Sequence, residues 1–162
     1  VGSEMCIRDS YYTEASIILT QADQMGYQPK FFGCDGLDGL LAVKNFDTKL
    51  AEGVMLLTPF AADATDDLTK KFVKEYKDKY DEVPNQFAAD AYDAIYAIKA
   101  AMEEAKVTPD MNVTDMGDAL KSAMTKVTID GLTGDEMSWS ESGEVNKDPK
   151  AVVIENVEYV GM

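Results

Sequence analysis

The chain has 162 residues, of which 46% are hydrophobic and 9% aromatic, a composition typical of a folded globular protein. Its formal net charge is −15, which argues against binding to nucleic acid or anionic membranes, because phosphate contacts need clustered lysine and arginine. Histidine is absent, which removes the commonest general base and the commonest metal ligand.

Residues 1–10 show neither strand alternation nor a helical period, and they end where a regular pattern begins. We interpret them as a sequence scar in place of the natural upstream chain and exclude them from the predicted fold. They lack the apolar segment of a signal peptide. No run in the chain approaches the roughly 20 apolar residues of a membrane helix. The compartment must therefore be inferred from function.

Residues 13–25 carry apolar side chains at helical spacing, and Gly26 is a natural helix stop. Residues 30–33 then predict a short buried strand, so that helix and strand form the αβ unit of a parallel sheet. Asp35–Gly36 follows at the carboxyl end of this strand, where open α/β sheets place their ligands. A short helix is expected over residues 37–43.

The middle of the chain is mostly helical by pattern. Residues 54–57 predict a second buried strand, and the small and acidic residues 61–67 are typical of a crossover. Aromatic side chains at steps of four then predict an amphipathic helix, with lysines on its outer side. The expected helices cover residues 68–80, 87–105 and 114–124.

The C-terminal part changes character again. A turn is expected at residues 140–143, and residues 150–160 predict a β strand. No internal repeat is visible. The order is therefore an α/β segment, then helices, then β structure. Two lobes that share segments of the chain would account for this order better than one layered domain.

Six motifs follow one another along nearly the whole chain after residue 10. They are Tyr11-Tyr12-x-Glu14; Gly26-x-x-Pro29-x-Phe31-x-Gly33-x-Asp35-Gly36; Ala51-Glu52-Gly53 before Thr58-Pro59-Phe60; Phe72-x-x-x-Tyr76 with Pro84; Ala91-Tyr92-Asp93-Ala94; and Asp130-Gly131-Leu132-Thr133-Gly134 with Gly143. None is specific by itself. Together, in this order, they resemble the periplasmic substrate-binding proteins of the branched-chain amino acid transport family, which have the type 1 periplasmic-binding-protein fold.

The resemblance implies an α/β fold of two lobes joined by three crossovers, present here as an incomplete, C-terminal part. Residues 11–59 would form part of the second lobe, and residues 60–126 would be crossover helices that pack on a missing first lobe. Residues 127–162 would return to the hinge as strands. The isolated chain is then expected to expose an apolar helix face and to self-associate.

By the same resemblance, the ligand contacts from this half fall on Tyr11, Asp35 and Phe87. Asp35 would accept the α-ammonium group of an amino acid, Tyr11 would add a polar contact or cover the site, and Phe87 would line the side-chain pocket. Each residue also has a structural reading. Asp35 before Gly36 suits an ordinary turn, Tyr11 could be frayed, and Phe87 lies on an apolar helix stripe typical of a core.

The implied function is that of the solute-binding component of an ABC transporter. It would bind a small amino acid, of the branched-chain type, between its lobes, and deliver it to a membrane permease. The location would be the periplasm, or the cell surface as an anchored lipoprotein. The same lobes also serve as sensor domains of receptors and regulators, and that alternative remains open.

An enzyme is the rival class. Asp35 and Asp38 could form a carboxylate pair, but a glycosidase needs a defined separation across a cleft, which neighbouring positions do not establish. Residues 63–67 and 110–118 lack the glycine and terminal glutamate of a calcium loop. We therefore expect no catalysis, no cofactor and no metal.

Two further residues are given structural roles. Asp93 is expected to be an exposed or capping carboxylate. Cys34 has no basic neighbour to activate it, so a packed thiol is expected. A disulfide between Cys34 and Cys6 has no supporting motif.

Overall fold

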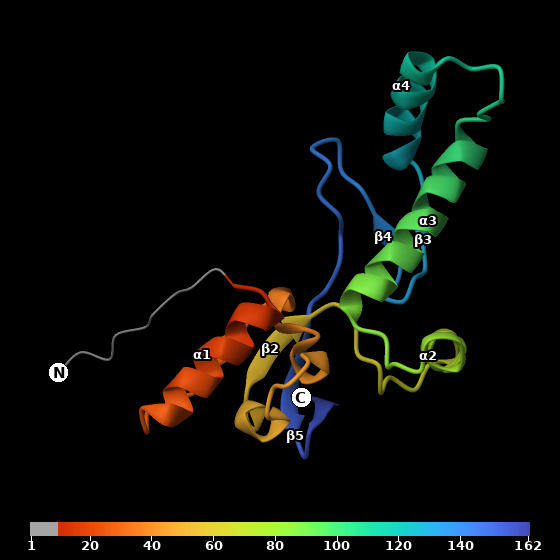
Figure 1. Cartoon of the computed structure of the whole chain (residues 1–162). Helices are drawn as coiled ribbons and strands as arrows, with labels where there is room; N and C mark the ends of the chain where they lie inside the picture. The colour runs from red at the N-terminus through yellow and green to blue at the C-terminus, as the bar shows by residue number, and fades with distance from the viewer. Residues whose placement is uncertain (1–9) are drawn as a thin grey trace. The chain divides into compact units, whose positions relative to one another are not determined.

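The computed structural model describes residues 10–162, which divide into two compact units (Figure 1). Unit 1 combines the chain up to Thr58 with Ala151–Met162, and unit 2 comprises Pro59–Lys150. All of the interpreted scar except Ser10 lies outside the described residues, as does Cys6. Within residues 10–162, no helix has the length and apolar character that crossing a membrane would require.

Unit 1 contains one long helix and a four-stranded sheet, with strand order β1-β2-β5-β6. The sheet is mixed, because β1 and β2 run parallel while β5 and β6 are antiparallel. Short 3₁₀ turns connect β1 to β2. The elements are α1 (Tyr12–Gln24), β1 (Phe32–Gly33), η1 (Asp35–Leu37), η2 (Leu40–Ala42), η3 (Thr48–Ala51), β2 (Met55–Thr58), β5 (Lys150–Glu155) and β6 (Glu158–Gly161).

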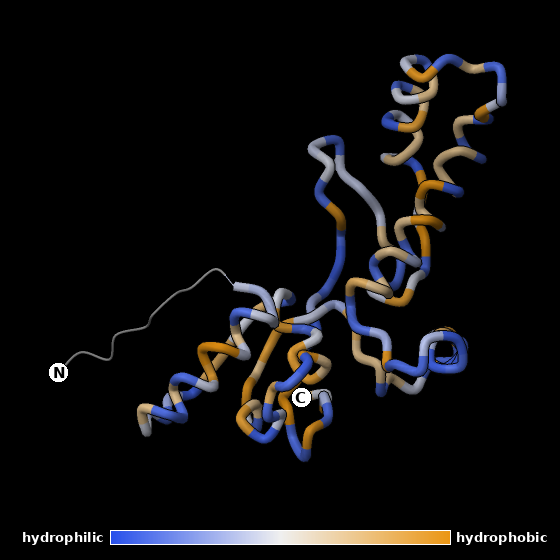
Figure 2. The backbone as a smooth tube through the Cα atoms, viewed as in Figure 1, coloured by the Kyte–Doolittle hydropathy of each residue, from blue (hydrophilic) through white to orange (hydrophobic). Residues whose placement is uncertain are grey.

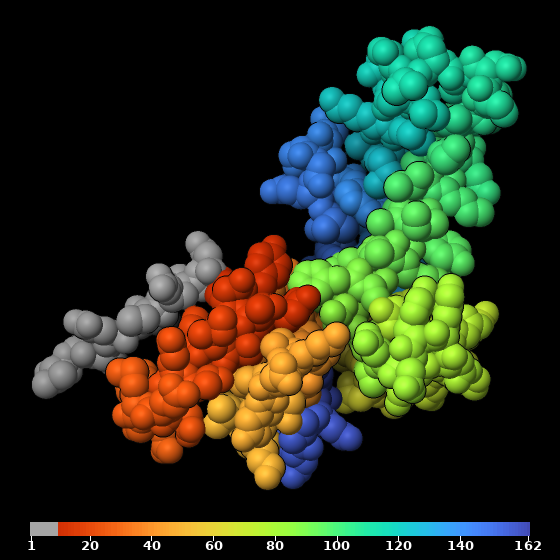
Figure 3. Space-filling model, in the orientation of Figure 1, coloured from red at the N-terminus to blue at the C-terminus, as the bar shows by residue number. Residues whose placement is uncertain are grey.

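The core of unit 1 forms where α1 covers the turns and the sheet. Leu19 of α1 belongs to the same buried cluster as Leu40, Val54 and Ile154, and each of these four side chains is at most 6% exposed. Ile154 belongs to the C-terminal segment, which lies beside residues 40–58 in the space-filling view (Figure 3). Burial of these side chains stabilises unit 1 and holds the C-terminal hairpin in the sheet.

Three details of unit 1 differ from the sequence-based expectation. Phe32 is 62% exposed, because β1 lies at the edge of the described sheet and only its other face meets the core. Gly39 adopts φ 106°, which breaks the expected helix at 37–43 into two 3₁₀ turns. The expected strand at 150–160 is a hairpin, whose turn residues Asn156 and Val157 both have positive φ.

Unit 2 contains three helices and a two-stranded antiparallel ribbon. The three helices begin and end within one or two residues of the predicted positions, because each start is fixed by a local cap. Asp66, Asn85 and Asn112 accept hydrogen bonds from backbone N–H groups in the first turns at 2.8, 3.2 and 3.0 Å. The elements are α2 (Asp67–Tyr80), α3 (Gln86–Glu104), α4 (Val113–Met124), β3 (Thr128–Ile129) and β4 (Met137–Ser138).

Two clusters of side chains hold unit 2 together. Phe60, Ala89 and Leu132 form a buried group that joins the start of the unit to α3 and to the turn after β3. Aromatic contacts then link α2 to α3, with the rings of Phe72 and Tyr92 5.3 Å apart. Hydrophobic residues recur along the whole of α3, including on its exposed side (Figure 2).

Candidate ligand-binding site

The start of α1 and the loop after β1 lie next to each other in unit 1. A Cβ atom built on Gly36 would stand 2.8 Å from the Ser10 carbonyl oxygen and 3.7 Å from Cδ1 of Tyr11. Only a residue without a side chain therefore allows the loop to approach the chain this closely. The structure thus brings Tyr11 next to the Asp35–Gly36 pair, although the two segments come from separate elements.

Asp35 is the first residue of the turn η1 and has an exposed side chain. Its Oδ1 accepts a hydrogen bond from the Gly36 N–H at 3.0 Å, which orients the carboxylate within its own loop. Tyr11 precedes α1 in extended conformation and is 63% exposed. An oriented, accessible carboxylate is suited to receive an ammonium group through charge-assisted hydrogen bonds, and the Tyr11 ring lies next to the glycine that follows it.

Phe87 lies in unit 2, in the first turn of α3, where its side chain is half-buried. The buried cluster of this region consists of Ala89, Phe60 and Leu132 and does not include Phe87. The structure therefore places Tyr11 and Asp35 in one unit and Phe87 in the other.

Asp38 differs from Asp35 in its environment, since it is only 5% exposed. It lies near the hydroxyl of Tyr159, which accepts hydrogen bonds from the N–H groups of Gly39 at 3.1 Å and Leu41 at 3.5 Å. Burial, and then the charge of Asp38, raise the pKa of Tyr159 to about 12. Asp38 and Tyr159 thus act in the packing of unit 1, and the exposed Asp35 does not share their environment.

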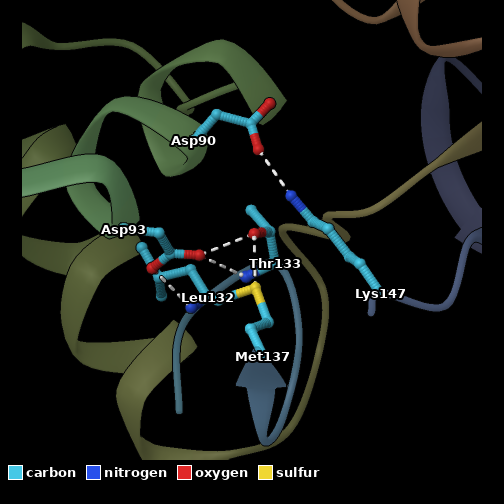
Figure 4. A network of polar contacts seen from close by, with 6 residues as sticks. All are labelled: Asp90, Asp93, Leu132, Thr133, Met137 and Lys147. Atoms are coloured by element: carbon cyan, nitrogen blue, oxygen red, sulfur yellow. Dashed lines mark hydrogen bonds and ion pairs between the residues drawn. The ribbon is translucent and has the colours of Figure 1, made fainter. Parts of the chain in front are cut away.

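Asp93 is the residue that sequence reasoning misjudged most. It is 6% exposed rather than exposed, and its carboxylate accepts three hydrogen bonds from the turn after β3 (Figure 4). The donors are the N–H of Leu132 at 2.8 Å, the N–H of Thr133 at 2.9 Å and the hydroxyl of Thr133 at 2.6 Å. The sequence does contain a sign of this burial, because Asp93 shares a helix face with Ala89 and Ala97, which are small apolar residues at steps of four.

Cys34 was expected to be packed, but its thiol is exposed, because it follows the two-residue edge strand β1 in an open loop. Within residues 10–162, no group of three Asp, Glu or Cys side chains is placed so that it could hold a metal ion. A hollow of about 390 Å³ lies between residues 16–24 of α1 and residues 43–46. It includes neither Tyr11 nor Asp35.

Comparison with known proteins is informative about the family. A model of the family described as periplasmic binding protein matches residues 11–156. A leucine-binding protein, LivK, from Thermotoga maritima is similar in structure, with a TM-score of 0.75 and 24% identity, over 94% of this chain and 42% of that one. A comparison with curated proteins found no match.

Two further solved structures show the same likeness. The branched-chain amino acid transporter substrate-binding protein LivJ from Streptococcus pneumoniae, solved in complex with isoleucine, has a TM-score of 0.73 and 25% identity, over 94% of this chain and 43% of that one. An extracellular ligand-binding receptor from Rhodopseudomonas palustris has a TM-score of 0.77 and 18% identity, covering 94% and 46%. The chain thus spans less than half the length of the structures it matches.

Proposed function

Because this chain belongs to the periplasmic binding protein family, we propose that it is part of the extracytoplasmic solute-binding component of an ABC transporter. The whole protein would bind a small amino acid or amino-acid-like ligand between two lobes and deliver it to a membrane permease. The match of residues 11–156 to the family carries this proposal, supported by the likeness to a binding protein solved with isoleucine.

Within this function, Tyr11 and Asp35 form the part of the ligand site that unit 1 contributes. The close approach of the chain at Gly36 supports this assignment, because it places the aromatic ring beside the loop that carries the carboxylate. Asp35 accepts the ligand's ammonium group, and Tyr11 covers it. By the family resemblance, Phe87 is proposed to line the pocket for the ligand's side chain. A branched-chain amino acid has both groups that these proposed roles require, a cation and an apolar side chain.

The domain assignment is part of the same proposal. Residues 11–59 belong to the second lobe, residues 60–126 pack on a first lobe, and residues 127–162 return to the hinge. Unpartnered apolar residues on α3 support this, since Ile95, Ile98 and Met102 are 66%, 49% and 40% exposed. Such a row of apolar side chains is typical of a face that another element covers. Without that cover, the chain self-associates.

The mechanism is ligand-driven closure. A ligand held by both lobes favours the closed arrangement by its difference in affinity for the closed and open states. A permease that recognises the closed state would then receive the loaded protein. A periplasmic or lipid-anchored location follows from this role.

Calorimetry on a protein that carries both lobes tests the site. Replacing Asp35 with alanine should weaken the binding of leucine, isoleucine or valine by about 2 kcal/mol or more, because the buried ammonium loses its charged partner. Asp23→Ala, on the exposed side of α1, is the control and should leave the affinity unchanged. Equal affinities for both variants would remove Asp35 from the site.

A further inference from the structure

The chain passes between the two units twice. Each of these two connecting segments is held to unit 2 by a side chain close to the unit boundary. It enters unit 2 between Thr58 and Pro59 and leaves between Lys150 and Ala151. On the entering side, Phe60 is 3% exposed and belongs to the buried cluster around Ala89. The first connection is therefore fixed to α3 by an apolar side chain.

The leaving connection is attached by an ion pair. Nζ of Lys147 lies 2.9 Å from Oδ1 of Asp90, and the two side chains are 21% and 41% exposed (Figure 4). The stem of Lys147 lies close to Gly134, since a Cβ atom built there would be 3.4 Å from Cγ of Lys147. This pair joins the segment after β4 to α3. Because most of the Lys147 side chain is buried, water screens the pair less than it screens a fully exposed one.

The two attachments fall on consecutive residues of α3. Ala89 belongs to the buried cluster of Phe60, and Asp90 pairs with Lys147. This turn of the helix is itself fixed at its start, because Asn85 accepts a hydrogen bond from the Ala88 N–H at 3.2 Å. One short, capped stretch of α3 therefore holds both ends of unit 2.

Little chain remains between the ion pair and unit 1. The backbone up to Asn146 is fixed by a hydrogen bond from its N–H to the Ser138 carbonyl at 2.9 Å. After Lys147, only Asp148 and Pro149 precede strand β5. Pro149 further restricts Asp148 to extended conformations. While Lys147 is paired with Asp90, only Asp148 and Pro149 lie between this attachment and β5.

We propose that the Asp90–Lys147 ion pair is a hinge anchor, which fixes the point where the second connection leaves unit 2 and so limits the orientations available to the two units. Without the pair, Lys147 and the two residues that follow it can move away from α3, while Phe60 still holds the first connection. The units then rotate about one fixed connection instead of two. This inference concerns the connection itself, requires no ligand, and does not depend on the proposed function.

The charge of Lys150 has a smaller electrostatic influence on the same end of unit 2. Burial raises the pKa of the Asp66 carboxyl, but hydrogen bonds from Thr69 and from its own backbone N–H, with a smaller effect of the Lys150 charge, outweigh it and lower the pKa below its ordinary value. Asp66 is the cap of α2, so the charge of Lys150 acts weakly on the start of that helix. Lys147 and Lys150, which stand before and after Asp148–Pro149, thus both act on carboxylates of unit 2.

Single-molecule energy transfer in the 162-residue chain tests the anchor, at concentrations too low for association. The dyes are placed on the exposed native Cys34 of unit 1 and on Lys121→Cys of α4, in a Cys6→Ser background. Lys147→Met keeps the aliphatic stem and removes the charge, and Asp90→Asn removes the partner charge. Both should broaden the distribution of transfer efficiencies, because the range of distances between the units increases.

The matched control is Lys99→Met, which breaks a 2.7 Å pair with Glu103 on the same helix, away from the connections. It should leave the distribution unchanged, and the exchange Asp90→Lys with Lys147→Asp should narrow it again. Parent-like distributions in both single variants would overturn the proposal. Loss of helical circular dichroism in both would also count against it, because an anchor between folded units leaves unit 2 folded.

Discussion

The hydroxyl of Thr133 donates a 2.6 Å hydrogen bond to the carboxylate of Asp93, which lies 40 positions earlier in the chain. Both side chains are buried, and the same carboxylate also accepts the N–H groups of Leu132 and Thr133. One side chain of α3 thus satisfies three donors of the turn between β3 and β4. This carboxylate therefore holds the turn after β3 against α3, while the hydrogen bonds from the Gly131 N–H to the Gly134 carbonyl and from the Glu136 N–H to Asp130 shape the turn itself.

Replacing Asp93 with alanine should destabilise unit 2 by about 3 kcal/mol or more, because three buried donors lose their acceptor. Asp93→Asn keeps one acceptor oxygen and should cost less. Urea unfolding followed by circular dichroism measures both. Asp118→Ala, at an exposed position of α4, is the control and should lie within about 0.5 kcal/mol of the parent. A similar small effect at Asp93 would contradict the structural role.

Two glycines should respond to alanine in opposite directions. A Cβ atom at Gly131 would lie 2.6 Å from the carboxylate atoms of Asp93, so Gly131→Ala should destabilise unit 2 by disrupting that contact. At Gly117, inside α4, nothing lies within 4 Å, and alanine should stabilise the helix by about 0.5–1 kcal/mol. Thermal unfolding of the two variants compares them. Shifts of the same sign would contradict the local geometry.

Gly36→Ala should weaken ligand binding without touching a ligand-contacting side chain. Its Cβ would lie 2.8 Å from the Ser10 carbonyl oxygen, so the loop must move away from the start of α1. Asp35 and Tyr11 would then separate. Calorimetry on a two-lobed protein should show an affinity at least about tenfold lower, which corresponds to about 1.4 kcal/mol. Gly161→Ala, with nothing within 4 Å, is the control.

The stability of unit 1 should fall at high pH because of Tyr159. Its pKa is raised from an ordinary 10.0 to about 12 in the folded chain, mainly by burial. The unfolded chain therefore loses this proton first, and the contribution to stability is complete below pH 10 and lost as the pH rises toward 12. Tyr159→Phe should remove this part of the pH dependence. An identical pH profile in the variant would contradict the assignment.

Lysine at Ile95 or Ile98 should reduce self-association of the 162-residue chain. These side chains are 66% and 49% exposed on one face of α3, and association would bury them. Sedimentation velocity over a concentration series measures the effect. Val113→Lys is the control, since that valine is 80% exposed but lies on α4. If Val113→Lys reduces self-association as much as the α3 variants do, the change in net charge, and not the apolar face of α3, explains the effect.

Patterns along the chain predicted the three helices of unit 2 well, because their caps and apolar periods are local. The same logic failed where a residue's environment is set by distant segments. Phe31 and Phe32 look alike in sequence, but Phe31 packs on the core and Phe32 is 62% exposed at the sheet edge. The hairpin at Asn156 was missed, because strand alternation does not register a reversal of direction.

The ligand site shows the same division. The sequence named Tyr11 and Asp35 through a resemblance, and the family and fold were confirmed by comparison, whereas the role of these residues in binding stays a prediction. Only the tertiary structure shows that the two segments meet at Gly36, since the contact joins elements separated by the whole of α1. The role of Asp93 is likewise visible only in the tertiary structure, because Ala91-Tyr92-Asp93-Ala94 by itself does not reveal a buried acceptor.

By itself, the sequence determined the family, the helices and the identity of the chemical groups, because periodicity, capping and motif order are properties of neighbouring residues. The tertiary structure decided which carboxylate is buried and which is exposed, and where the chain is anchored. Asp93 and Asp35 are the same residue type, but three donors from a distant turn surround the first, and its own loop orients the second. Burial and hydrogen-bond partners are set by residues far apart in sequence, and they separate a structural carboxylate from a candidate ligand-binding one.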